Sequence, residues 1–230
     1  MAPVLTFYLR KNCVNCRVVW LYMVKYKLTF TTVDIETNRP PGFSSLSPNG
    51  MVPLILDDET TVQGSLAIVL YLGEKYTSNA GLGLTLEQRA KIDSVMCWAS
   101  SALLRDLAHN YVYPSLLHED DALPGSANAS LVAYGKAEVL FHLNTLENNY
   151  LSKNKFLCGK KSCFADCWVA VVLSLLELLS FDFSPWPRVK ALMAEIQGNV
   201  EYMDVSHAHE EDVRQCCYGL ASSTSNLKKV

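Results

Sequence analysis

Two cysteines separated by two residues, Cys13 and Cys16, are the residues of this sequence best suited by type and spacing to chemistry. They follow a short apolar run typical of a β-strand and open a run with helical periodicity. A thiol at such a turn lies near backbone N–H groups and the positive end of the helix dipole, which stabilise a thiolate and lower the cysteine pKa. The sequence therefore predicts Cys13, the more N-terminal thiol, as the reactive one.

Two other interpretations of this pair stay open, namely buried structural thiols and half of a zinc site. Zinc is less favoured because no second pair with this spacing and no nearby histidine pair complete a ligand set. A solvated acidic helix start explains the one metal-like group near the C-terminus, which consists of His207, His209, Glu210, Glu211 and Asp212. We therefore predict no metal site.

Ser65 marks a second place where chemistry is expected. It follows Gly64 and precedes an apolar run with helical spacing, which makes it an N-cap or first-turn residue. Its hydroxyl and the unpaired N–H groups of the first turn are predicted to form an anion site.

The composition indicates a globular protein that works on small molecules or protein surfaces. With 230 residues, 50% apolar and 19% charged, the chain is long enough for two domains. The net charge is −3 and the basic residues are scattered, which argues against a nucleic-acid partner and a membrane surface. The start of the chain does not look like a signal peptide, so we expect a cytoplasmic protein in which most of the eight cysteines are free thiols.

The elements that must position these residues fall into two groups. Strands are predicted at Val4–Leu9, Leu28–Ile35, Val52–Leu56 and Thr60–Val62, with helices at Val14–Tyr26 and Leu66–Tyr76. Only helices follow, at Leu86–Leu117, Ala129–Tyr150, Ala165–Ser180 and Pro187–Gly198. The apolar run from Trp168 to Leu179 is too short to span a membrane and predicts a buried core helix. We expect a first domain at 1–77, a linker at 78–83, a helical domain at 84–218 and a flexible tail at 219–230.

This order, with a cysteine turn at the first helix and Val52-Pro53 at the start of the third strand, resembles the cytosolic glutathione S-transferases over nearly the whole chain. The resemblance implies an α+β thioredoxin-like N-terminal domain (βαβ-ββα), an all-α helical-bundle C-terminal domain and a homodimer. It also implies glutathione as the co-substrate. Its cysteine part would bind the backbone of Val52, which precedes a cis Pro53. Its γ-glutamyl carboxylate would bind at Ser65, with Gly64 and Gln63 alongside.

Within that family the chain is similar to the theta class, in which an activating serine lies four residues before an arginine. The matching position before Arg17 holds Cys13. A cysteine there is typical of omega-, lambda- and beta-like members, which carry out thiol transfer and reduction. The helical domain follows the theta order instead, through Trp98, Arg105, Tyr113-Pro114, Phe156-Leu157 and Ala165-Asp166.

Three residues depart from the family pattern. Gly64 stands where an acidic or amide residue is expected, Met51 where a basic residue often contacts glutathione, and Cys163 where a Ser or Thr caps a helix. Losing a good cap costs about 1 kcal/mol.

The expected function is conjugation of glutathione to small hydrophobic electrophiles, as in detoxification. Thiol transfer or glutathione-dependent reduction through Cys13 is a second possibility, since cysteine is a good nucleophile towards disulfides. Arg105 and Tyr113 would line the electrophile pocket, whereas Cys16 and Tyr8 are predicted to pack in the core. The alternative is a non-catalytic protein of the same fold that binds hydrophobic ligands or scaffolds a partner.

Overall fold

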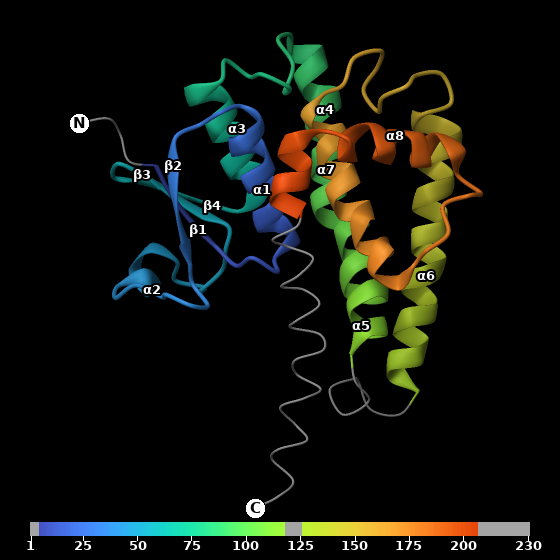
Figure 1. Cartoon of the computed structure of the whole chain (residues 1–230), viewed down its shortest axis with the longest axis horizontal. Helices are drawn as coiled ribbons and strands as arrows, with labels where there is room; N and C mark the ends of the chain where they lie inside the picture. Colours follow the sequence, from blue (N-terminus) through green and yellow to red (C-terminus); the bar gives the residue numbers. More distant parts are fainter. Residues whose placement is uncertain (1–4, 118–125, 207–230) are drawn as a thin grey trace, which may run out of the picture.

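The computed structural model describes residues 5–117 and 126–206, and these form two parts that lie side by side (Figure 1). The first part is a four-stranded sheet with its helices, and every element after it is helical. The chain is therefore a thioredoxin-like domain followed by an all-helical domain, as predicted. The predicted tail and the histidine and acidic group after residue 206 lie outside the described residues.

The sheet joins a βαβ unit to a ββα unit. β1 (Leu5–Leu9) is parallel to β2 (Phe30–Asp34) and antiparallel to β3 (Leu54–Asp57), which pairs with β4 (Thr60–Gln63), so the order is β2-β1-β3-β4. α1 (Val14–Lys25) connects β1 to β2, and α3 (Ser65–Tyr76) follows β4. These elements match the predicted ones to within two residues at nearly every end.

The register of the sheet places the predicted site at one edge. Tyr8, Leu54 and Gln63 are paired in one row across β1, β3 and β4. The turn after β1, the residues before β3 and the residues after β4 therefore leave the sheet at the same end. They carry the candidate residues of the N-terminal domain.

Alternation along β1 divides the core of the first domain. Leu5, Phe7 and Leu9 belong to the large core with α1 and α3, whereas Tyr8 points to the other face and packs with Phe43. Tyr8 is 8% exposed, which confirms the prediction that it is a core residue. Phe43 begins α2 (Phe43–Leu46), a helix that periodicity did not predict because it is only one turn long.

In the helical domain the outer ends agree closely with the predicted helices, and each predicted helix consists of one or more consecutive helical segments. They are α4 (Leu86–Trp98), η1 (Ala99–Leu103), η2 (Arg105–Val112), α5 (Tyr113–Leu116), α6 (Ala127–Thr145), η3 (Leu146–Tyr150), α7 (Phe164–Leu173), η4 (Ser174–Leu179) and α8 (Pro187–Gln197). Residues 200–206 are also helical. η1, η2 and η3 have π-helical bonding, and η4 is a 3₁₀ helix.

α7 is the central helix of the second domain, and all ten of its residues are buried. The predicted core helix at Trp168–Leu179 is thus confirmed in its first part, whereas its last residues form η4 and reach the surface at Glu177. Among the described residues, no helix combines the length and apolar character that crossing a membrane requires.

Candidate functional site

Cys13 is the N-cap of α1, with an extended backbone (φ −90°, ψ 114°). Its sulfur accepts a hydrogen bond from the Cys16 thiol and others from the backbone N–H groups of Cys16 and Asn15. These bonds and the charge of Arg10 outweigh burial and lower the pKa of Cys13 to about 7. A much larger share of the Cys13 side chains is therefore thiolate at neutral pH than in an ordinary cysteine, which is mostly protonated.

Cys16 is 1% exposed and packs in the core beneath the turn. Burial raises its pKa well above the ordinary value, and its hydrogen bond to Cys13 raises it further. This confirms the prediction that Cys16 is a packing residue. The structure adds a role that the sequence did not indicate, since Cys16 is also the S–H donor that stabilises the Cys13 thiolate.

Alkylation of Cys13 by iodoacetamide is expected to follow a titration midpoint near pH 7, because only the thiolate reacts and its pKa is about 7. The rate is measured by mass spectrometry of the peptide that contains Cys13. In Cys16→Ala the midpoint should move towards about 8.5, the ordinary cysteine value, because the S–H donor is gone. Cys16→Ser is the matched control, since its hydroxyl still donates. An unchanged midpoint in Cys16→Ala would refute the role given to the Cys16 thiol.

Ser65 lies next to the Cys13 turn because Asn15 joins the first turns of α1 and α3. The Ser65 hydroxyl donates to the Asn15 side-chain oxygen at 3.1 Å. Ser65 is the first residue of α3, and the preceding Gly64 has φ +90°. The N-terminal N–H groups of both helices therefore converge on one region, which favours an anion.

Val52-Pro53 is a cis peptide, as predicted. The Pro53 carbonyl accepts the N–H of Gly64 at 3.0 Å, so this segment is tied to the start of α3. Within residues 5–117 and 126–206, the backbone N–H and C=O of Val52 have no hydrogen-bond partner. They remain available to an extended ligand, as β-strand addition requires.

Gln63 and Gly64 occupy this edge in different ways. The Gln63 amide donates to Ser47 Oγ, Asn49 Oδ1 and the Met51 carbonyl at 2.7–2.9 Å, so it holds the loop that leads to Val52. A Cβ built on Gly64 would meet no atom within 4 Å, so the place of the missing acidic or amide side chain is open space. The Gln63 side chain is thus occupied by hydrogen bonds inside the protein, whereas the space beside Gly64 is empty of protein atoms.

Arg105 and Tyr113, the predicted electrophile-pocket residues, lie on the second domain in η2 and α5. Arg105 is mostly exposed and forms a two-point bond to Asp106, with Nε and Nη2 each within 2.9 Å of a carboxylate oxygen. The ring of Tyr113 packs edge-on against His109. Trp98 stacks on Tyr150, as expected of a packing residue.

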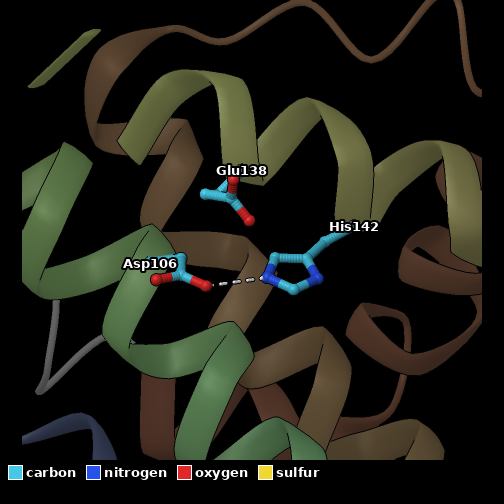
Figure 2. Close-up of side chains that lie close together, drawn as sticks. All are labelled: Asp106, Glu138 and His142. Carbon is cyan, nitrogen blue, oxygen red and sulfur yellow. Dashed lines mark hydrogen bonds and ion pairs between the residues drawn. The ribbon is translucent and has the colours of Figure 1, made fainter. Parts of the chain in front are cut away.

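Asp106, Glu138 and His142 are the one group among the described residues whose types and spacing could hold a metal ion (Figure 2). Asp106 projects from η2, and the other two project from α6. Burial alone would raise the pKa of Asp106, but hydrogen bonds from Arg105 and His142 lower it. Asn110 donates to the same carboxylate at 3.1 Å. Side chains of the protein therefore fulfil the hydrogen-bonding capacity of the Asp106 carboxylate, and its bond to His142 links η2 to α6.

Arg17 holds the Cys13 helix in place, a role that the sequence did not indicate, because there Arg17 served only to locate Cys13 four residues before it. It is 3% exposed and donates to Ser174 Oγ, Tyr202 Oη and Ser206 Oγ at 2.6–2.9 Å. α1, and with it the Cys13 turn, is thereby fixed to the helical domain. Its position in an apolar helical stretch was the only available signal, because its three partners lie more than 150 residues away.

Two family models match the chain. Residues 7–80 match the glutathione S-transferase N-terminal domain, and residues 104–198 match the glutathione S-transferase C-terminal domain. Together they cover the sheet edge, the Cys13 turn and most of the helical domain.

Individual proteins similar to this chain point to the same family. Glutathione S-transferase theta-1 of Mus musculus is 26% identical over 219 residues, which are 90% of this chain and 88% of that protein. A dichloromethane dehalogenase of Methylophilus leisingeri is 29% identical over 219 residues, which are 87% of this chain and 78% of that protein. The structure of human glutathione-S-transferase T1-1 superposes with a TM-score of 0.73 at 24% identity, over 91% of this chain and 90% of that one.

Proposed function

Because the chain belongs to the glutathione S-transferase family and is theta-like, we propose that it conjugates glutathione to small hydrophobic electrophiles, with Cys13 at the activating position. The observation that carries the proposal is the Cys13 sulfur at the α1 N-terminus, held beside the α3 N-terminus by the bond between Asn15 and Ser65. Glutathione is the co-substrate of this family.

The N-terminal domain offers groups that fit glutathione. The unpaired backbone N–H and C=O of Val52 suit a peptide-like ligand, and Ser65 with the α3 N-terminus suits a carboxylate. The open space beside Gly64 leaves room for that carboxylate. Met51 is exposed and supplies no positive charge, so binding depends on these groups.

Cys13 has a different task in each of two reactions. In conjugation, the glutathione sulfur attacks the electrophilic carbon and a leaving group such as chloride departs, while protonated Cys13 donates a hydrogen bond to that sulfur. In thiol transfer, the Cys13 thiolate attacks a glutathione mixed disulfide and releases the other thiol. A second glutathione then takes the glutathionyl group and leaves as the disulfide. The lowered pKa of Cys13 specifically favours this second function.

The remaining parts of the proposal follow from the family. Arg105 and Tyr113 stay predicted lining residues of the electrophile side, and the boundaries 1–77, 78–83 and 84–218 stay predicted domain limits. We expect a homodimer in the cytoplasm, and light scattering tests the dimer. The name of the bacterial relative suggests small halogenated alkanes as electrophiles to try first.

Retention on immobilised glutathione, followed by assays with a chloronitrobenzene, with dichloromethane and with a mixed disulfide, tests the function. Retention with turnover of a halogenated substrate supports conjugation, and turnover of the mixed disulfide supports thiol transfer. A protein that is not retained and turns over none of these substrates is the non-catalytic alternative.

Replacing Ser65 by Ala is expected to weaken glutathione binding by about tenfold, because a charge-assisted hydrogen bond to the carboxylate is worth about 1.5 kcal/mol. The dissociation constant is measured by isothermal titration calorimetry. Ser94→Ala on α4 is the control, since the Ser94 hydroxyl bonds only its own helix backbone. Equal binding by both variants would contradict the role of Ser65.

A further inference from the structure

A second pair of thiols, Cys158 and Cys163, lies in the helical domain apart from the Cys13 site. Cys158 is half-buried and Cys163 is buried. A hydrogen bond from the Cys163 thiol to the Cys158 sulfur lowers the pKa of Cys158, and the same bond together with burial raises the pKa of Cys163. The pair thus repeats the arrangement of Cys13 and Cys16, with one reactive thiol and one buried proton donor.

Cys158 is also reached from a basic surface. It borders two cavities of about 550 and 540 Å³. Lys91 lines both cavities, and Lys160 and Lys161 line the second. Glu87 is the one acidic side chain among the described residues on these walls. Three ammonium groups against one carboxylate favour an anionic ligand in these cavities, whereas at the Cys158 sulfur itself the buried Asp166 carboxylate opposes the charge of Lys91.

The two cysteines are held in different ways. Cys163 is the N-cap of α7, and its N–H donates to the Asp166 carboxylate at 2.8 Å. Cys158 lies in a turn that continues through Gly159, which has φ +145°, into the exposed residues 160–162. The backbone on either side of Cys158 is held as well, by Leu157 N–H on Asp166 and Gly159 N–H on the Phe156 carbonyl. The hydrogen bond between the two thiols thus keeps their sulfurs next to each other, and a disulfide requires them to close to about 2.05 Å.

We propose that Cys158 and Cys163 form a second redox site that takes an anionic low-molecular-weight disulfide of the glutathione disulfide type. The Cys158 thiolate attacks one sulfur of the disulfide, a mixed disulfide forms, and one thiolate leaves. The Cys163 sulfur then attacks the Cys158 sulfur, and its proton leaves with the second thiol. Two protein thiols are oxidised to one disulfide, and the small disulfide is reduced to two thiols.

Peptide mapping of the full-length protein after exposure to glutathione disulfide tests this site. Trypsin cuts after Lys155, Lys160 and Lys161, so the two cysteines fall in separate peptides that only a disulfide can join. We expect the joined peptides in non-reducing digests, in the wild type and equally in Cys13→Ser, which makes the result independent of the proposed function. Glutathionylation of Cys158 should also be several-fold faster than that of the exposed Cys97.

Three variants separate the steps. In Cys163→Ser the mixed disulfide on Cys158 should persist, and the fold should be kept because serine is a better N-cap than cysteine. Circular dichroism checks the fold.

Cys167→Ser is the matched control, since Cys167 is buried within α7 and it is Cys163 whose thiol bonds the Cys158 sulfur, so the joined peptides should be unchanged. Lys91→Gln should slow modification of Cys158 several-fold. The proposal is overturned if no joined peptide forms, if Cys167 is the partner, or if Cys158 reacts no faster than Cys97.

Discussion

The Cys13→Ser variant is expected to lose disulfide reduction by at least about 100-fold while it keeps glutathione conjugation. A serine hydroxyl does not attack a disulfide, because it is protonated at neutral pH and is a poor nucleophile towards sulfur. The same hydroxyl is a better hydrogen-bond donor than a thiol, so it can stabilise a glutathione thiolate at least as well as Cys13 does. Steady-state rates with a mixed disulfide and with a chloronitrobenzene, measured on the same preparations, give the ratio of the two activities.

Two further variants make this result specific. Cys13→Ala removes both the nucleophile and the donor, so both activities should fall. Cys16→Ala leaves the nucleophile in place, so disulfide reduction should persist at a lower rate at pH 7, since the pKa of Cys13 rises without its S–H donor. If disulfide reduction in Cys13→Ser equals that of the wild type, thiol transfer through Cys13 is wrong. If conjugation survives in Cys13→Ala, the activating group lies elsewhere.

The features that were predicted correctly depend on the pattern of residues that are neighbours in the sequence. The cysteine turn, the cis peptide at Val52-Pro53 and the helix start at Ser65 each follow from residues adjacent in the chain. Their convergence follows from strand pairing, because one row across the sheet holds Tyr8, Leu54 and Gln63. A βαβ unit followed by a ββα unit already implies that row, so this edge could be predicted.

The features that were missed depend on contacts between distant segments. The amide of Gln63 is held by the loop at Ser47, a pairing that spacing alone does not give. The side-chain oxygen of Asn15 accepts from Ser65, which lies 50 residues away. The three hydroxyl partners of Arg17 come from segments beyond residue 170. Such pairs exist only after the two domains have packed together.

The helix cap at Cys163 shows how a local rule can be satisfied by an unexpected residue. A thiol was expected to cap poorly, but the box forms, with the Cys163 sulfur accepting a backbone N–H and Asp166 accepting the N–H of Cys163. The carboxylate accepts the N–H of Leu157 as well, at 2.8 Å. Asp166 thus satisfies two buried donors, and the weaker half of the box is the thiol.

Replacing Asp166 by Ala is therefore expected to lower the free energy of unfolding by about 3–5 kcal/mol, because two buried N–H groups lose their acceptor at the start of the central helix. Asp166 is fully buried, so water does not replace the lost bonds without opening the core. Asp166→Asn keeps one acceptor oxygen and should show an intermediate loss. Asp182→Ala is the matched control, since Asp182 accepts the N–H and hydroxyl of Ser184 in the same local manner but is exposed, and its loss should stay below about 1 kcal/mol. Urea unfolding followed by circular dichroism measures all three variants. Equal losses in Asp166→Ala and Asp182→Ala would show that the α7 cap does not hold the helical domain together.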